Sequence, residues 1–281
     1  MSVARKLMGV QPSFVDLMLG VFPPSSPGDI GLASGLSPED VLRFATDHGF
    51  KHLCQKDGFN YDRELKAAQN LVEQPESFFE NPMATILSPH QVTGAQEQSL
   101  ICLDHFFDSS SQKQGMLEAI NKYMESKGLS QTLIEDVSAV ADEFITNAIY
   151  NAPFIDPSTN VNPGLSRMDT EIKLKGGKAG RLLMAHDDTQ LVIGCEDPYG
   201  SLNLDQYLNK IRTTYLRGPA ATMNFGSGGA GLGSYIIFNA GSSLYFGVKA
   251  AHVTLLCCSI PLRMSYKKRV QLPKHLHIIH R

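Results

Sequence analysis

The stretch DEFITNAIYN, residues 142–151, decides the fold, and it closes a long helical run that begins near Ser130. Glu143, Asn147 and Asn151 are spaced at i, i+4 and i+8, so they share one helix face and follow one another at about 6 Å along the axis. Magnesium prefers carboxylate and amide oxygens, so this face suits an ion held at the edge of a cleft. A solvated helix face is the alternative interpretation. The opposite stripe repeats at the helical period and is expected to face a core: Leu133, Val137, Val140, Ala141, Phe144 and Ala148.

Composition and charge restrict the classes of protein to consider. The chain has 281 residues, 42% of them hydrophobic and 19% charged, which is typical of a globular protein with one large domain or two smaller ones. A net charge of −3 gives no electrostatic reason to expect a nucleic acid partner. The apolar run after Arg5 and Lys6 is interrupted by Gln11, Pro12 and Asp16, so neither a signal peptide nor a membrane span is expected. We therefore predict a cytoplasmic protein.

The cysteines favour a reducing compartment. They are odd in number, scattered and free of CxxC spacing, which is unlike a disulfide framework or a zinc site. The five are Cys54, Cys102, Cys195, Cys257 and Cys258.

Residues 1–95 are predicted to form a small, mostly helical N-terminal module that ends in a proline-rich linker. Its best-defined part is a helix that Gly49 ends, a short strand at 51–55, Lys56 and a second helix at 61–72. This order loosely resembles the last third of a response-regulator receiver domain. A helical module packed on the next domain is the alternative.

Residues 96–262 carry the elements of a larger domain, and residues 263–281 form a basic, partly apolar tail. We expect the tail to be solvated, with docking to an acidic partner as the alternative. Hydrophobic periodicity and turn residues predict the following order for the domain. It is an edge strand within 96–107, helices at 112–127 and 130–151, strands at 168–175, 181–186 and 190–195, helices at 204–215 and 232–239, and strands at 244–248 and 252–260.

An acidic loop follows the strand predicted at 190–195. That strand delivers Asp197 to a turn that contains Gly200. A carboxylate at a strand end can accept a hydrogen bond from a buried amino group, for example that of adenine, and a nearby glycine lets a flat ring approach the backbone. An ordinary Asp-Pro-Tyr-Gly turn is the alternative.

A glycine-rich segment, GSGGAGLG at residues 226–233, runs straight into the helix predicted at 232–239. Glycines before a helix expose successive backbone N–H groups at the positive end of the helix dipole, which is a seat for phosphate. The segment lacks the Lys-Ser/Thr of a P-loop and follows no strand, so neither a P-loop nor a Rossmann motif is predicted. A flexible surface loop is the alternative.

Together and in this order, the three pieces resemble the GHKL superfamily of ATPases over residues 96–262. The helix with Glu143 and Asn147 resembles the family's N-box, and Asp197 with Gly200 resembles its adenine-binding box. Within the superfamily the chain is most similar to the anti-sigma-factor serine/threonine kinases. The resemblance implies an α+β fold, a two-layer α/β sandwich with a mostly antiparallel sheet on one side and the long helices on the other. Histidine kinases carry an upstream helix pair with a phosphoacceptor histidine, and neither His90 nor His105 stands in such a context.

The resemblance also implies roles for single residues. Asn147 would bind Mg²⁺, and Glu143 would be the general base that takes a proton from a partner's serine or threonine hydroxyl. Asp197 would receive the adenine amino group. Gly231 and Gly233 would offer N–H groups to the phosphates.

Other positions of the motifs are matched less closely. Gly229 and Leu232 belong to the segment that resembles the final glycine box. Asn151 stands where many of these kinases carry histidine, so its contact with nucleotide has no defined role. The adenine box usually reads Asp-x-Gly-x-Gly, whereas this chain has Tyr199 and Ser201 at the two glycine positions.

The resemblance implies an ATP-binding signalling protein that uses ATP and Mg²⁺, a kinase of the partner-switching type. Its partner would be a protein such as a sigma factor or an anti-anti-sigma factor, and a homodimer is a further arrangement to test. A non-catalytic GHKL-fold module is the alternative, because Tyr199 or Ser201 could fill the adenine slot. The sequence does not name the regulated partner.

Overall fold

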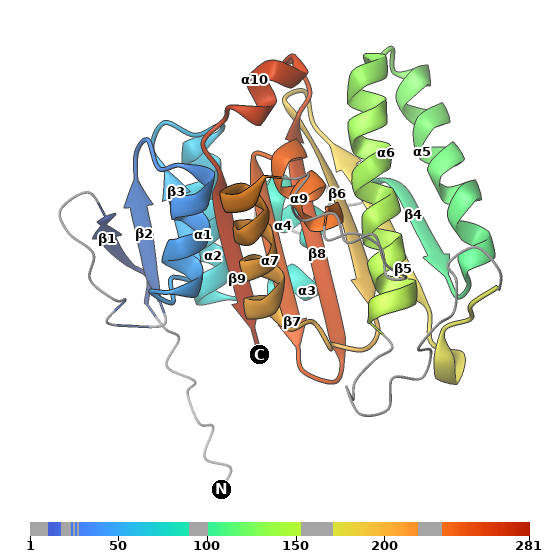
Figure 1. The fold of residues 1–281 in the computed structure, drawn as a ribbon, viewed down its shortest axis with the longest axis horizontal. Coiled ribbons are helices and arrows are strands. Elements are labelled where there is room, and N and C mark those ends of the chain that lie inside the picture. The colour runs from blue at the N-terminus through green and yellow to red at the C-terminus, as the bar shows by residue number, and fades with distance from the viewer. Residues whose placement is uncertain are drawn as a thin grey trace, which may run out of the picture.

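The structure is a computed structural model that describes residues 11–17, 24, 26, 28–89, 101–152, 171–218 and 232–281. In these ranges the strands form one nine-stranded sheet in the order β1-β2-β3-β9-β7-β8-β6-β5-β4 (Figure 1). The strands are β1 Ser13–Asp16, β2 Asp29–Ala33, β3 His52–Gln55, β4 Ile101–Phe107, β5 Gly180–His186, β6 Gln190–Asp197, β7 Ser243–Lys249, β8 Val253–Pro261 and β9 His275–His280.

Strand direction divides the sheet into two parts. From β7 through β8, β6 and β5 to β4 every pairing is antiparallel, as predicted for residues 96–262. By contrast β1, β2 and β3 run parallel, and β9 pairs antiparallel with β3 and parallel with β7. The protein is therefore a mixed α and β fold with a mixed sheet, and strands from both sides of the predicted boundary at residue 95 belong to it. The predicted division into domains stays a prediction.

Helices cover both faces of the sheet, which corrects the expected two-layer sandwich to three layers (Figure 1). On one face the core contains side chains of α1, α5, α6, α7 and α9, and on the other face a second cluster contains side chains of α2, α3 and α4. The N-terminal module supplies this second layer, because its short helices bury apolar residues that would otherwise be exposed. The helices are α1 Pro38–Thr46, α2 Tyr61–Glu73, α3 Glu76–Glu80, α4 Pro82–Leu87, α5 Lys113–Ser126, α6 Gln131–Thr146, α7 Leu204–Arg217, α9 Gly233–Ala240 and α10 Tyr266–Val270.

The C-terminal residues 263–281 are not a solvated tail. They form α10 and then β9, which lies between β3 and β7 in the sheet. Leu276 and Ile278 face the main core, and two of the cations, Arg269 and Lys274, are buried beside partners. The guanidinium of Arg269 pairs with Asp136, and the amine of Lys274 donates to two backbone carbonyls near the end of α9, at 2.6 and 3.1 Å. Burial lowers the pKa of Lys274 to about 8.

The helix that carries the predicted polar row is buried along its apolar stripe, as expected. Ser130 caps its first turn by accepting from the N–H of Leu133 at 3.4 Å. After Thr146 the helix continues as a π-helical turn over Asn147–Asn151, a widened turn that often marks functional sites.

Two further expectations can be compared only with the described residues. Of the strand predicted at 168–175, the first residues lie outside the described ranges, and residues 171–175 make only a single bridge pair, Ser109 with Lys173. None of the helices within the described ranges has the length and apolarity needed to cross a membrane.

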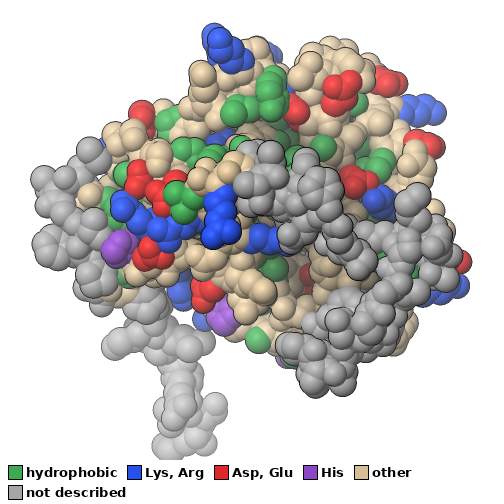
Figure 2. Space-filling view, in the orientation of Figure 1, with side chains coloured by type: hydrophobic (Ala, Val, Ile, Leu, Met, Phe, Trp, Pro, Cys, Tyr) green, Lys and Arg blue, Asp and Glu red, His purple; other side chains and the backbone are tan. Residues whose placement is uncertain are grey.

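The N-terminal module also contacts α7. Arg212 of α7 donates from Nε to Glu39 at 2.8 Å and from its terminal nitrogen to both carboxylate oxygens of Asp47 at 2.8 Å. Figure 2 shows such adjoining basic and acidic side chains on the face of the molecule over α1 and α7. This pairing joins α1 to α7.

Candidate functional site

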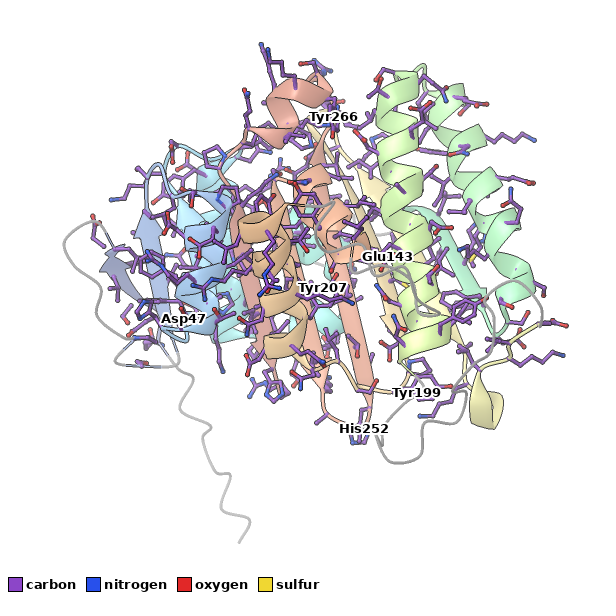
Figure 3. The ribbon with its side chains drawn as sticks, viewed as in Figure 1. Asp47, Glu143, Tyr199, Tyr207, His252 and Tyr266 are labelled. Atoms are coloured by element: carbon purple, nitrogen blue, oxygen red, sulfur yellow. The ribbon has the colours of Figure 1, made fainter. Side chains whose placement is uncertain are left out.

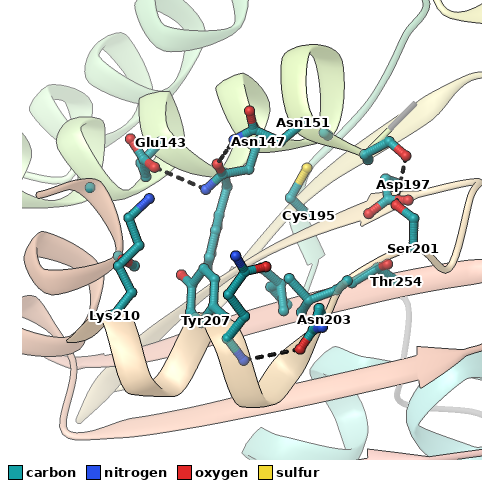
Figure 4. A pocket seen from close by; sticks show the side chains of 18 of the residues that line it. Glu143, Asn147, Asn151, Cys195, Asp197, Ser201, Asn203, Tyr207, Lys210 and Thr254 are labelled. Carbon is teal, nitrogen blue, oxygen red and sulfur yellow. Dashed lines mark hydrogen bonds between the residues drawn. The ribbon is translucent and has the colours of Figure 1, made fainter. Parts of the chain in front are cut away.

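A cavity of about 600 Å³ lies among α6, its π-helical turn, α7, the start of α9 and the ends of β6 and β8 (Figure 4). It brings together five of the residues that the sequence singled out. They are Glu143, Asn147, Asn151, Asp197 and Gly233.

The polar row of α6 forms a chain of hydrogen bonds along one wall of the cavity. The amide nitrogen of Asn147 donates to Oε1 of Glu143 at 3.0 Å, and the amide nitrogen of Asn151 donates to Oδ1 of Asn147. The π-helical turn therefore does not separate the three side chains. Each side chain orients its neighbour, so the row presents a defined set of oxygens and nitrogens to the cavity.

The carboxyl group of Glu143 lies directly against Gly233, the first residue of α9. A Cβ atom added to Gly233 would stand 1.8 Å from Cδ and 1.9 and 2.1 Å from the two oxygens of Glu143. Only glycine allows this approach. A carboxylate is electrostatically favourable at a helix N-terminus, so Glu143 stabilises the end of α9 that was predicted to receive phosphate.

The other predicted residues of the glycine box are placed differently. Gly229 and Gly231 lie outside the described residues. Leu232 directly precedes α9 and is not part of the cavity lining.

Asp197 and Thr254 meet at the opposite end of the cavity. They are cross-strand partners in the β6–β8 pairing, and both line the cavity. Burial raises the pKa of Asp197 to about 6, although hydrogen bonds from its neighbours, including the N–H of Tyr199 at 3.0 Å, act against the increase. A buried acceptor beside a hydroxyl can form two hydrogen bonds with one ligand.

The backbone conformation and the close packing at Gly200 require glycine, independently of any ligand. Its φ is +60°, and a Cβ atom there would stand 2.0 Å from the carbonyl oxygen of Lys249 in the turn between β7 and β8. It does not line the cavity. The backbone of that turn explains why glycine is needed here, and the interpretation that Gly200 admits a flat ring stays a prediction.

Tyr199 does not fill the cavity either. It is 5% exposed and packs in the core, with the ammonium of Lys178 at 4.7 Å from the centre of its ring. Figure 3 shows it at the end of the sheet where His252 lies, away from Glu143 and Tyr207. Ser201 does line the cavity, and its hydroxyl donates to the carbonyl of Ala152 at 2.6 Å.

The sequence analysis missed the wall made by α7. Asn203 caps this helix by accepting from the N–H of Gln206 at 3.0 Å. The spacing of three and four residues along a predicted helix was the available signal, because it places side chains on one face. Thr254 could be assigned to this site only once β8 was known to pair with β6. The cavity-lining residues that α7 and its cap contribute are Asn203, Gln206, Tyr207, Asn209, Lys210 and Thr213.

Chemically, the cavity has a carboxylate at each end and one lining cation, Lys210, among the described residues. No group of three or more His, Cys, Asp or Glu able to hold a metal ion occurs in the part of the chain that is described. Mg²⁺ is usually bound by one or two protein groups together with substrate phosphates, so Asn147 and Glu143 fit such an ion only when a phosphorylated ligand supplies the remaining oxygens.

Comparison with known proteins assigns no family. No protein-family model matches the chain, and no curated protein matches it. A chain in the crystal structure of the SiaB-SiaC complex from Pseudomonas aeruginosa is similar with a TM-score of 0.43 and 15% sequence identity, over 68% of this chain and 97% of that chain. At this distance the likeness supports no statement about activity.

Proposed function

We propose that the cavity binds Mg·ATP and that the chain is a serine/threonine protein kinase of the GHKL type. The observation that carries this proposal is the convergence of three distant segments on one cavity: the α6 row, the Asp197 loop and Gly233 at the start of α9. These are the segments whose order in the sequence resembles that superfamily. The partner would be a regulatory protein, such as a sigma factor or an anti-anti-sigma factor.

Asp197 and Thr254 would hold the base. An adenine ring presents an amino donor next to a ring nitrogen acceptor, which matches a carboxylate acceptor beside a threonine hydroxyl. Both side chains come from paired strands, so their relative position is fixed by the sheet. Such a seat distinguishes adenine from a base with a carbonyl at the same position, because that carbonyl would face the carboxylate.

The phosphates would lie toward Gly233 and the start of α9, where backbone N–H groups and the helix dipole favour anions. Asn147 would hold Mg²⁺ together with phosphate oxygens, and the ion would supply positive charge to the phosphates. The hydroxyl oxygen of the partner would bond to the γ-phosphorus as the bond to the β–γ bridging oxygen breaks and ADP leaves. Glu143 would take the hydroxyl proton.

Isothermal titration with ATP and Mg²⁺ tests the proposal directly. We expect saturable heat at or below millimolar ATP, and we expect Asp197→Asn to weaken it, because the asparagine amide presents a donor where the amino group of adenine must donate. Absence of heat at millimolar ATP would refute nucleotide binding.

Comparison of Glu143→Ala with Asn147→Ala separates the base from the metal ligand. Loss of the base should abolish phosphoryl transfer and leave ATP affinity nearly unchanged, because the carboxylate contacts the attacking hydroxyl. Loss of the magnesium ligand should weaken both transfer and binding. An equal loss of ATP affinity in the two variants would contradict the assigned roles.

A second candidate function is a non-catalytic module that binds a protein partner and no nucleotide. The position of the Glu143 carboxyl against Gly233 favours it, because this carboxylate covers the helix end where phosphate would bind. In that case both α6 substitutions should change partner affinity alike, and titration with ATP should give no heat in any variant.

A further inference from the structure

One wall residue of the cavity carries a buried hydroxyl that lacks a partner. Tyr207 lines the cavity, and its phenolic oxygen is buried with no hydrogen-bond partner among the described residues. A buried polar atom without a partner lowers stability, so an acceptor supplied by a ligand or a water would stabilise this hydroxyl.

The hydroxyl lies at the Glu143 end of the cavity. Burial, and then the negative charge of Glu143, raise the pKa of Tyr207, so at neutral pH the phenol keeps its proton and can donate it in a hydrogen bond. Figure 4 shows the Tyr207 ring between α7 and α6, on the side where Lys210 and Glu143 lie and away from Asp197. The donor therefore faces the part of the cavity that adjoins Gly233.

Tyr207 is held in place from two sides. Its ring packs edge-on against Phe246 of β7, with ring centres 5.6 Å apart and an angle of 67° between the planes. Its helix is joined to α1 through Arg212. Because the ring is fixed, the hydroxyl has a defined position, and none of the described residues brings an acceptor to it.

We propose that Tyr207 determines specificity for a phosphorylated ligand by donating its hydroxyl hydrogen bond to a phosphate oxygen. This inference rests on the proposed function, which places the phosphates at the same end. Phosphate suits the position, because an anionic acceptor forms the strongest hydrogen bond with a phenol, and Lys210, one helical turn further along α7, adds a positive charge. The Tyr207 hydroxyl thus distinguishes ATP and ADP from an unphosphorylated nucleoside.

The test is a set of titrations on the full chain and two matched variants. Tyr207→Phe removes only the hydroxyl, so the packing against Phe246 is kept. Tyr215→Phe is the control: its hydroxyl donates to Asn239 instead, and it stands on the same helix but outside the cavity lining. The probes are Mg·ATP, adenosine and tripolyphosphate.

We expect Tyr207→Phe to weaken Mg·ATP and tripolyphosphate about tenfold or more, and to leave adenosine within about twofold. Tyr215→Phe should leave all three affinities unchanged. Equal affinity of wild type and Tyr207→Phe for Mg·ATP would overturn the inference, and so would an equal loss of adenosine, which indicates a structural role.

Failure of the proposed function has a different signature. If the wild type binds tripolyphosphate but neither ATP nor adenosine, and Tyr207→Phe weakens tripolyphosphate, the adenine seat is wrong and the role of Tyr207 stands. A wild-type chain that binds none of the three probes overturns both proposals.

Discussion

Two clusters of buried polar side chains lie on opposite faces of the same sheet, and they differ in how their charges are satisfied. We call one the cleft cluster, which lines the cavity on the α6 face: Glu143, Asn147, Asp197, Tyr207 and Thr254. We call the other the Glu64 network, which lies on the α2 face: Glu64, Tyr245, His277 and His52.

In the Glu64 network one carboxylate oxygen binds two partners, whereas the other, Oε1, has no hydrogen-bond partner among the described residues. One oxygen of Glu64 accepts the Tyr245 hydroxyl at 2.5 Å and the imidazole nitrogen of His277 at 3.2 Å, and both carboxylate and imidazole are fully buried. Burial acts to raise the pKa of Glu64, but the hydrogen bond from His277 and the neighbouring His and Tyr groups outweigh it, so this pKa is lowered. The network joins α2 to β7 and β9 and has a structural role.

In the cleft cluster, by contrast, burial outweighs the hydrogen bonds that Asp197 accepts. Burial raises the pKa of Asp197 to about 6, and the hydroxyl of Tyr207 has no partner among the described residues. Groups whose charge or hydrogen bonding is unsatisfied in the folded chain are typical of binding and catalytic sites. The opposite pKa shifts of Glu64 and Asp197, together with the cavity, therefore favour the cleft cluster as the place where a ligand binds.

The largest expected effect is loss of the Glu64 network. Glu64→Ala removes the acceptor for two buried donors, Tyr245 and His277, so we expect the free energy of unfolding to fall by about 3–5 kcal/mol. Urea unfolding at pH 7.5 measures this decrease in the free energy of unfolding. The control is Glu73→Ala, an exposed glutamate on the same helix, which should change stability by less than about 0.5 kcal/mol. If the two variants are equally stable, the Glu64 network has no structural role.

Removing the buried charge of Asp197 from the cleft cluster should change stability in the opposite direction. Asp197→Asn keeps the shape and the acceptor for the Tyr199 N–H, and it removes an ionised group that burial disfavours. We expect the variant to be more stable than the wild type at pH 7.5, by up to about 3 kcal/mol.

The pH dependence of this gain follows from the direction of the shift. The pKa of Asp197 rises on folding from 3.8 to about 6, so between these values the folded state binds more protons than the unfolded state. Wild-type stability therefore falls as pH rises through this window, and the advantage of Asp197→Asn should largely disappear by pH 4. Asp188→Asn, in the exposed turn between β5 and β6, is the control for the substitution itself. A destabilised Asp197→Asn at pH 7.5 would show that this carboxylate is as well satisfied as Glu64.

A smaller effect tests how Glu143 is held. A Cβ on Gly233 would overlap the Glu143 carboxyl, which lies at the end of a flexible side chain and can move aside, so we expect Gly233→Ala to destabilise by about 1 kcal/mol or less. In a chain that also carries Glu143→Ala the overlap is gone, so the same substitution should cost much less. Gly115→Ala in α5 is the control, because its Cβ would meet no atom within 4 Å and should be neutral or stabilising. Equal costs with and without Glu143 would mean that the carboxyl does not lie on Gly233 in solution.

The sequence by itself determined the local features of the site. The spacing of Glu143, Asn147 and Asn151 predicted one helix face, and the structure joins them by hydrogen bonds. Most helices and strands between residues 101 and 261 were predicted near their observed bounds, because hydrophobic period and capping residues are read over a few turns of chain. The roles of these residues toward ATP and Mg²⁺ stay predictions.

Tertiary structure alone decided the features that depend on pairing between distant segments. Thr254 joins Asp197 only because β8 pairs with β6, and Tyr207 comes near Glu143 only because α7 and α6 line the same cavity. The basic C-terminal residues predicted a solvated tail, yet Arg269 and Lys274 are buried, since the partners that satisfy their charge lie in other elements. Local sequence contains the period of an element, whereas the partner that satisfies a buried group is set by the fold.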